Sequence, residues 1–426
     1  MVKKIRELIN YLLLNPLFLS SIILCFLFYT GVINSNNKNS FVSLIPISEI
    51  KELEGIVVSA PVKSLTNENY YFIDLNVTAV KSKENIYSQG KGIIKLLLKS
   101  DFVESLYPNK LNSKSKRNLL IESGLNIKFV VKSLNEDLFL VTDILDSFYE
   151  KSLKGRIFYF RALCRLNFKR LLNSWGNAGG LLLALLSGSK EYTDTSLNLS
   201  FKRAGLSHIL ALSGMHLSLF GSLGFFVAKR FSSKKKAYNI KMLLILLFVW
   251  FAGFTPSLLR AFIFSIIIYI LTALHIKKIN DISSLSLCFL IHSAIQPTHI
   301  QTPAFMLSYG ALFGIITVGS FFKEKLSKIF TLKIVANFCD SFGAQICTFP
   351  ILINLFGEVA PIGVISSLIV SPLLTIFLYT GLIGIIICMI IPFLSPAFND
   401  IIDVIYNIIS NFIVYFSSFP LITLRN

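Results

Sequence analysis

Long apolar runs constrain this chain more than any other feature of its sequence. A helix needs about 20 apolar residues to cross the hydrocarbon core of a bilayer. Only 15% of the residues are charged, whereas soluble domains carry roughly 25%. We therefore predict a polytopic α-helical membrane protein. The main apolar segments are 206–228, 241–275, 283–296, 303–322, 334–356, 359–393 and 399–424.

The apolar segment 241–275 is too long for one span, and the sequence GFTPS interrupts it. Gly253 and Pro256 both disfavour a continuous helix, so we expect a hairpin or a broken helix here. With such a break, three basic stretches fall on the same side of the membrane: Lys229–Lys241, Lys277–Lys278 and Lys323–Lys333. Because short basic loops of membrane proteins remain on the cytoplasmic side, this arrangement favours a cytoplasmic N-terminus. We attribute the net charge of +18 mainly to this rule, without excluding nucleic-acid binding.

The N-terminal segment 1–35 joins basic residues to an apolar run from Tyr11 to Ile33. This run is longer than the apolar core of a signal peptide, and no small-x-small cleavage site follows it. We expect an uncleaved transmembrane anchor.

The block 44–147 is moderately polar and rich in short β-type runs. Turn-forming sequences such as TNEN and NSKSKRN separate these runs, which predicts a small barrel or sandwich outside the membrane. The expected strands are 55–62, 70–80, 92–98, 125–131 and 138–144.

The segment 151–174 is predicted to form a basic amphipathic helix. Such a helix lies on a membrane surface or lines a groove. Its cations at helical spacing are Lys154, Arg161, Arg165 and Lys169. The apolar side is expected to hold Leu153, Ile157, Phe160, Leu163, Phe168 and Leu171.

The sequence HILALSGMHL, residues 208–217, places polar groups inside an apolar segment. On one helix, His208 and His216 would lie about 80° apart and could border one face. Ser213 could share that face, and Gly214 permits close approach of a neighbouring helix. The two histidines either bind carbonyls of adjacent helices or line a polar path. Their spacing does not suit zinc, and the six scattered cysteines form no CxxC pair, so we expect no metal or cofactor.

Two further polar groups interrupt the apolar segments. Arg260 follows the GFTPS break within about one turn and suits either a phosphate or a lipid headgroup. Ser341 and Gln345 are spaced i, i+4 and are expected on one helix face. Together these groups predict a polar interior between the helices.

Four sequences carry a resemblance to a known family. FKRAGLSHILALSGMHLSLF (201–220), FAGFTPSLLRAF (251–262), PAFMLSYGALFGI (303–315) and AQICTFPILINLFGEVAP (344–361) occur in this order. They resemble the competence domain of the ComEC family of DNA-uptake channels. The resemblance implies a multi-span channel domain over 175–426 and an OB-fold-like domain at 44–147. The path residues that it implies are His208, Ser213, Gly214, His216, Pro256, Ser257, Arg260, Ser308 and Gln345.

The chain departs from the ComEC pattern in two ways. It has no cluster resembling the family's metallo-β-lactamase-like nuclease, so we expect no enzymatic activity. Met306 also stands where the family often has glutamine, which weakens the case for Ser308.

The resemblance implies an inner-membrane channel that conducts single-stranded DNA into the cytoplasm during natural transformation. Membrane lipids, a separate nuclease, a DNA receptor and a cytoplasmic ATPase are the implied partners, and a homodimer stays open.

Three alternatives remain at this stage. The first is a transporter of a small anionic or lipid-linked solute, which a broken helix with an arginine would also suit. The second is a family member that has lost its function. The third is an intramembrane enzyme using Ser213 and His216, whose spacing on one helix gives poor attack geometry.

Overall fold

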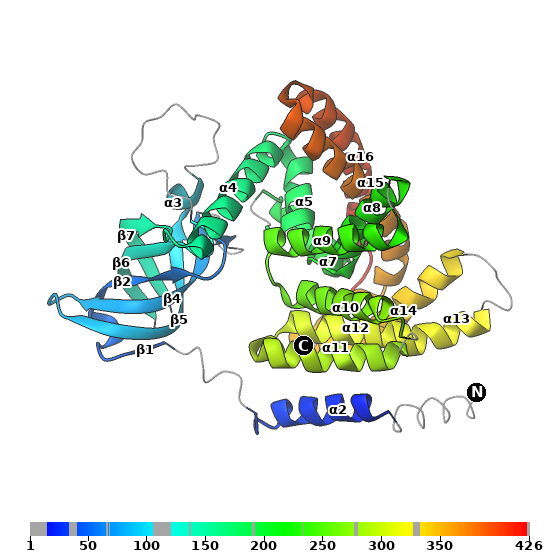
Figure 1. The fold of residues 1–426 in the computed structure, drawn as a ribbon, viewed down its shortest axis with the longest axis horizontal. Helices are drawn as coiled ribbons and strands as arrows, with labels where there is room; N and C mark the ends of the chain where they lie inside the picture. The colour runs from blue at the N-terminus through cyan, green and yellow to red at the C-terminus, as the bar shows by residue number, and fades with distance from the viewer. Residues whose placement is uncertain are drawn as a thin grey trace. The chain divides into compact units, whose positions relative to one another are not determined.

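The computed structural model divides into two compact units (Figure 1). The barrel unit comprises Asn36–Leu183 and Ser189–Thr193. The helical unit comprises Met1–Ser35, Ala184–Gly188 and Asp194–Asn426. The structure describes residues 15–33, 41–64, 67, 69–104, 121–135, 138–189, 192–231, 233–276, 280–326 and 333–423.

The barrel unit is built from one sheet that closes on itself. Its strands are β1 (Val42–Ser43), β2 (Ile50–Val57), β3 (Val62–Lys63), β4 (Tyr70–Ser82), β5 (Tyr87–Lys99), β6 (Asn126–Asn135) and β7 (Leu138–Phe148). The strand order is β1-β5-β7-β6-β2-β4-β3, and an additional pairing of β4 with β5 closes the ring. β5 and β7 are parallel, while the other paired strands are antiparallel.

Alternation of apolar residues explains why these segments form a barrel. Tyr71, Ile73 and Leu75 of β4 point into the core, and the residues between them are less buried. The five strands expected from the sequence correspond to β2, β4, β5, β6 and β7. The first expected strand, 55–62, begins five residues after β2 does and runs past its end, because β2 spans Ile50–Val57.

Two helices follow the barrel strands in the sequence. α4 (Leu153–Asn173) begins after Ser152, whose Oγ accepts a hydrogen bond from the Gly155 N–H at 3.1 Å. Leu166 of α4 packs with Tyr71 and with Val103 of α3 (Ser100–Glu104). α5 (Gly176–Ser187) follows, and its last residues belong to the helical unit.

The helical unit contains helices throughout and one short pair of strands, β8 (Glu358–Val359) with β9 (Ile422–Thr423). Its main helices are α2 (Pro16–Tyr29), α6 (Thr195–Arg203), α7 (Ser207–Leu210), α8 (Gly214–Phe231), α9 (Lys234–Ala252), α10 (Pro256–Ala273), α11 (Asp281–Ile295), α12 (Pro303–Gly314), α13 (Ser320–Leu326), α14 (Lys333–Phe356), α15 (Gly363–Ile390) and α16 (Ser395–Ser417). A 3₁₀ turn, η3 (Pro297–His299), precedes α12, and a π-helical turn, η4 (Ile315–Gly319), joins α12 to α13.

Five stretches of the described residues are long and apolar enough to cross a membrane. They are Pro256–Ala273, Pro303–Leu326, Ile334–Phe356, Gly363–Ile390 and Pro392–Ser417. Pro16–Tyr29, Gly176–Ser187 and Asp281–Ile295 are shorter apolar helices. The number and length of these helices fit the predicted polytopic class.

The break expected at GFTPS separates α9 from α10. Gly253 ends α9 with φ of +101°, a value that favours glycine over residues with a side chain. Pro256 then begins α10, where its missing N–H costs nothing. The two breakers read from the sequence therefore divide this segment as expected.

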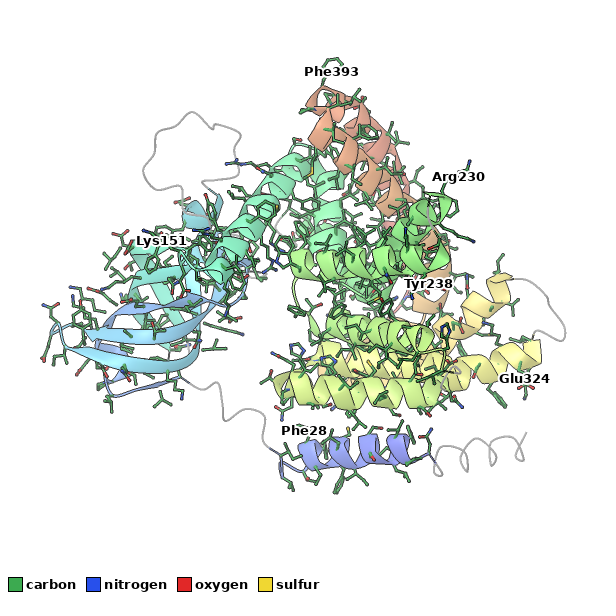
Figure 2. All side chains as sticks on the ribbon, viewed as in Figure 1. Phe28, Lys151, Arg230, Tyr238, Glu324 and Phe393 are labelled. Carbon is green, nitrogen blue, oxygen red and sulfur yellow. The ribbon has the colours of Figure 1, made fainter. Side chains whose placement is uncertain are left out.

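α2 packs inside the helical unit. Asn15 Nδ2 donates to Ser283 Oγ of α11 at 2.8 Å, and the ring of Phe18 stacks on that of Phe313 at 5.9 Å. Phe28, labelled in Figure 2, is buried in the same apolar cluster as Leu259. Residues 1–14 of the expected anchor lie outside the described residues, and α2 itself has 14 residues.

Candidate functional site

The two histidines of the sequence HILALSGMHL do not lie on one helix. The chain turns at Gly205, whose φ is +74°, and the short helix α7 carries an exposed His208. Ala211 is extended, with φ −77° and ψ 134°, and α8 begins only at Gly214. The expectation that His208 and His216 border one helical face is therefore wrong, because the backbone breaks between them.

Ser213 and His216 instead close the first turn of α8. His216 Nδ1 accepts the Ser213 N–H at 3.1 Å, and Ser213 Oγ accepts the Met215 N–H at 3.3 Å. This is the reciprocal pattern of a capping box, with histidine in the position usually held by glutamate or glutamine. It satisfies N–H groups that a helix start would otherwise leave unpaired. Capping thus explains the spacing of these two polar residues.

Arg260 of α10 lies against this first turn of α8. A Cβ placed on Gly214 would be 3.6 Å from Arg260 Nη2 and 3.4 Å from Ala261 Cβ. The Nε of Arg260 is buried without a hydrogen-bond partner, and so is Nε2 of His216. Four of the residues implied by the ComEC resemblance therefore meet here: Ser213, Gly214, His216 and Arg260.

A polar network continues from Arg260 through three further elements. The Cys288 thiol on α11 donates to the Arg260 carbonyl at 3.3 Å, and Tyr309 Oη of α12 donates to the Cys288 carbonyl at 3.2 Å. Tyr309 Oη also lies 3.2 Å from His292 Nδ1, and His292 Nε2 lies 3.1 Å from His299 Nδ1. We name this set, Arg260, Cys288, His292, His299 and Tyr309, the α10–α12 network.

Sequence reasoning missed most of the α10–α12 network. His292 lies in the apolar segment 283–296, and Tyr309 follows the expected path residue Ser308 directly. An ionisable residue within an apolar segment is the general signal that would have found His292.

Three expected path residues lie near the start of α10 or on α12. Pro256 holds the first position of α10, and Ser257 Oγ donates to the Ala304 carbonyl at 3.4 Å. Ser308 is half-buried on α12.

Gln345 belongs to a different group of contacts. Its Nε2 donates to the Ala360 carbonyl at 2.7 Å, close to where Gly205 and Gly363 approach each other. The ring of His208 lies beside the backbone of Gly205. Six of the expected path residues therefore form two groups, with Ser213, Gly214, His216 and Arg260 in one and His208 and Gln345 around Gly205 in the other.

Ser341 and Gln345 share one face of α14, as their spacing predicts. Ser341 Oγ accepts from Ser367 Oγ at 3.3 Å, and Gln345 contacts Ala360, so both face the chain leading into and forming the start of α15. Among the described residues, no group of three His, Cys, Asp or Glu side chains could hold a metal ion.

A family model described as "Competence protein" matches residues 185–426, more than half of the chain. The chain belongs to this family. The match covers the Arg260 group and the Gly205 group, and the apolar helices make this competence family member a multi-pass membrane protein.

The chain is similar to a curated protein, ComE operon protein 3 of Bacillus subtilis (strain 168). It is 26% identical over 206 residues, which cover 48% of this chain and 26% of the relative. The chain therefore matches about a quarter of that protein's length. No solved structure matches the chain.

The expected basic helix precedes the family match, and its cations do not face outward as predicted. Arg165 and Lys169 are both 4% exposed, and they lie 3.1 and 3.6 Å from Glu122 Oε1. Arg161 Nη1 donates to Ser123 Oγ at 2.7 Å, so of the four expected cations only Lys154 is exposed. The expectation of a basic surface formed by all four is wrong, because an acidic residue distant in sequence draws three of them inward.

The opposite side of α4 is apolar and exposed near its start. Leu153 is 76% exposed and Phe160 is 61% exposed. The helix follows Lys151, labelled in Figure 2. α4 is thus amphipathic as predicted, but its charged face is turned to the protein.

Glu122 keeps its charge despite burial. Burial raises the pKa of its carboxyl group, but the positive charges of Arg165, Lys169 and Arg161 outweigh this effect and hold the pKa below its ordinary value. Its Oε2 is buried without a hydrogen-bond partner. This acid joins α4 to the barrel through charge.

The outer face of β4 and β5 carries cations and aromatic rings. Lys91, Lys95 and Lys99 are spaced four residues apart along β5, so they lie on one face of the strand, and all three are exposed. Tyr70 pairs with Lys99 and Phe72 with Leu97 across the two strands, and both rings are half-buried on this outer face. We name these five residues, Tyr70, Phe72, Lys91, Lys95 and Lys99, the β4–β5 face.

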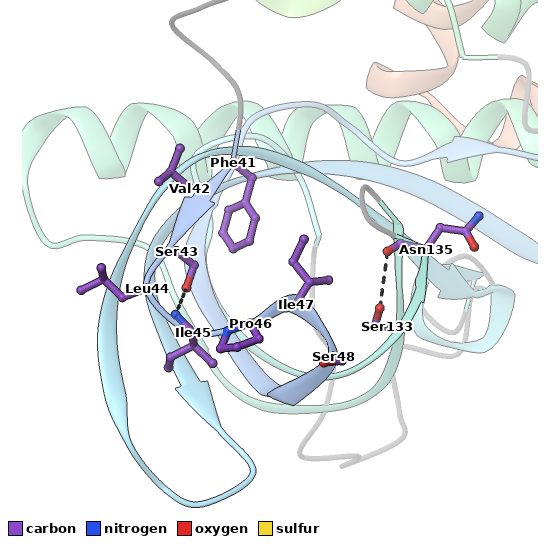
Figure 3. A pocket seen from close by; sticks show the side chains of 10 residues that line it. All are labelled: Phe41, Val42, Ser43, Leu44, Ile45, Pro46, Ile47, Ser48, Ser133 and Asn135. Carbon is purple, nitrogen blue, oxygen red and sulfur yellow. Dashed lines mark hydrogen bonds between the residues drawn. The ribbon is translucent and has the colours of Figure 1, made fainter.

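A pocket of about 750 Å³ lies at the barrel beside the segment Phe41–Ser48, and Ser133 and Asn135 complete its lining (Figure 3). Two hydrogen bonds within this lining are drawn there, from the Ile45 N–H to Ser43 Oγ at 3.1 Å and from Ser133 Oγ to the Asn135 carbonyl at 3.4 Å. The hydroxyl groups of Ser43 and Ser133 thus bond within the lining.

Proposed function

We propose that this chain conducts single-stranded DNA through the cytoplasmic membrane during natural transformation. The carrying observation is Arg260, whose Nε is buried and unpartnered beside the first turn of α8 among apolar helices. An arginine kept among membrane-spanning helices normally serves a ligand path or a charge partner. Membership of the competence family favours DNA as the ligand.

Arg260 suits a phosphate group for two physical reasons. Its guanidinium is planar, permanently charged and able to form paired hydrogen bonds with phosphate oxygens. The first turn of α8, where Gly214 lies, also carries the positive end of the helix dipole. A strand that reaches Arg260 and the start of α8 would therefore meet two favourable groups.

The barrel would collect the strand before it enters the helices. The closed ring is formed by β2, β4, β5, β7 and β6, and its one parallel pair is β5 with β7. A five-stranded ring of this kind supports an OB-fold-like domain. In that fold the second and third strands, here β4 and β5, commonly bind oligonucleotides. The β4–β5 face pairs lysines with aromatic rings, the combination that binds single strands without sequence preference.

The distribution of positive charge supports an orientation of the chain in the membrane. We propose a cytoplasmic N-terminus and an extracytoplasmic barrel, because the basic stretches at Lys229–Lys241 and Lys323–Lys333 would then be cytoplasmic. Strand degradation and the motor force are assigned to separate proteins, a nuclease and a cytoplasmic ATPase. A DNA receptor, surrounding lipids and a second copy of the chain complete the proposed partners, and the chain itself is proposed to have no enzymatic activity.

Internalisation of labelled DNA tests this function. Replacing Arg260 by alanine removes a charge-assisted hydrogen bond, worth about 1.5–3 kcal/mol, and should reduce uptake about 10- to 100-fold. Ser265→Ala is the matched control on the same helix, because the Ser265 hydroxyl donates to the Ala261 carbonyl of its own helix at 2.8 Å. Unchanged uptake in Arg260→Ala, at normal membrane levels, would remove Arg260 from the path.

A small anion is the second candidate ligand, because Arg260 and one helix start are sufficient for a phosphate ion. Uptake of labelled phosphate and of labelled single strands into the same proteoliposomes distinguishes the two. Transport of phosphate alone would favour the small-anion function.

A further inference from the structure

The loop between α11 and α12 is fastened by two histidines. His292, on the last turns of α11, is 0% exposed, and His299 lies on η3. Their rings meet with Nε2 of His292 3.1 Å from Nδ1 of His299, at an interplanar angle of 81°. We name this contact the histidine pair.

The hydrogen bonds around His292 leave one proton between the two rings. Tyr309 Oη lies 3.2 Å from the Cys288 carbonyl and 3.2 Å from His292 Nδ1. If Tyr309 donates to the carbonyl, His292 Nδ1–H donates to the Tyr309 oxygen and His299 Nδ1–H donates to His292 Nε2. If Tyr309 donates to His292 Nδ1 instead, His292 Nε2–H donates to His299 Nδ1. Either arrangement of the neutral pair places a single proton between Nε2 of His292 and Nδ1 of His299.

Protons can be counted from this arrangement. A first added proton makes one ring positive, and a single N–H still lies between Nε2 of His292 and Nδ1 of His299. A second added proton places an N–H on both nitrogens. Two facing N–H groups on two positive rings cannot share a 3.1 Å contact.

The surrounding charges oppose the second proton. Arg260 on α10 and His299 are the groups whose charges act on His292. Tyr309 on α12 contacts His292 directly, and Cys288 on α11 contacts Tyr309 in turn. On α2, which also packs against α11, the titratable residues are Cys25 and Tyr29.

We propose that His292 and His299 form a proton-binding site that holds one added proton with its contact intact and opens when a second one binds. Because burial and the surrounding charges oppose the second proton, opening requires a pH below the range of about 5 to 8 in which an unperturbed histidine titrates. The ligand is the proton itself, and the site stands on hydrogen-bond geometry that is independent of DNA.

Opening of the pair would reach the start of a membrane-spanning stretch. The His299 carbonyl accepts from Thr302 Oγ1 at 2.6 Å, and the same Oγ1 accepts the Phe305 N–H at 3.3 Å to cap α12. Loss of the ring contact therefore removes one link between η3 and α11, while η3 stays attached to α12. Proton binding and the position of this loop are thereby linked.

Solid-state NMR of the full chain in lipid bilayers, with labelled histidine, tests the proposal. The chain has five histidines, so few ring signals are expected. The His292–His299 ring cross-peak should be present at neutral pH, survive the first protonation step and disappear in the second. The exposed His275 is the control and should show no inter-ring cross-peak at any pH.

The variant His299→Gln separates a coupled pair from two independent histidines. With its partner removed, His292 should titrate in one step and show no inter-ring cross-peak. The proposal is overturned if His292 titrates identically in wild type and in His299→Gln, or if the cross-peak is missing at neutral pH. These signals do not depend on DNA uptake, so they fail or succeed separately from the proposed channel.

Discussion

At the scale of single residues, Glu122 is the strongest test of the barrel unit. It is 3% exposed and lies within 3.6 Å of both Arg165 and Lys169. Removing one partner of a buried ion pair costs about 3–5 kcal/mol, because the opposite charge stays buried. Glu122→Gln should therefore lower the free energy of unfolding of this unit by that amount, measured by hydrogen exchange of β6.

Asp101→Asn on the exposed start of α3 is the control for Glu122→Gln and should change hydrogen exchange little. The pH dependence follows from the sign of the shift. The pKa of Glu122 is lowered in the folded unit, so its contribution is complete above about pH 4.3, the ordinary glutamate value, and is lost as the pH falls through the folded pKa. Equal free energies of unfolding for wild type and Glu122→Gln above this pH would contradict the assigned ion pairs.

Ser213 distinguishes a helix cap from a nucleophile. Its Oγ accepts the Met215 N–H at 3.3 Å and lies 3.3 Å from His216 Nδ1, which accepts the Ser213 N–H at 3.1 Å. Ser213→Ala should cost about 1 kcal/mol of stability, as loss of an N-cap does, and leave DNA uptake largely intact. Complete loss of uptake at normal membrane levels of the protein would support the catalytic alternative.

At the scale of elements, breaks caused by glycine and proline were predictable and the break before α8 was not. Gly253 and Pro256 act on their own backbone, so the end of α9 follows from local sequence. The extended residue Ala211 carries no such signal. The orientation of α4 was equally hidden, because Glu122, 43 residues away, decides which face is buried.

The β4–β5 face and α4 make opposite predictions for DNA binding. Each lysine that contacts a phosphate contributes about 0.7 to the slope of log affinity against log salt for a single strand. Replacing Lys91, Lys95 and Lys99 together by alanine should therefore reduce the slope by about 2 in a fluorescence binding assay.

Two controls belong to this assay. Lys132→Ala changes an exposed lysine on β6 and should leave the slope unchanged. Arg165→Ala changes a buried cation of α4 and should lower stability without changing the slope. A slope that fell with Arg165→Ala, and not with the triple variant, would assign DNA binding to α4.

At the scale of the whole molecule, the sequence predicted the classes of both units and much of the Arg260 group. Hydropathy alone indicates the membrane helices, and strand alternation indicates the β unit. The expectation that the polar residues share one interior path is not met by the described contacts, because side-chain spacing does not report which helices meet. The contacts instead form two groups, around Arg260 and around Gly205.

The central claim is that a DNA strand passes the Arg260 group. A photo-crosslinking amino acid at Ser257, three residues before Arg260 on α10, tests it most directly during uptake of labelled DNA. The same group at Leu246, 52% exposed on α9, is the control. The account predicts crosslinks to DNA from position 257 and not from position 246. Continued uptake with no crosslink at 257, or with equal crosslinking at both positions, would contradict it.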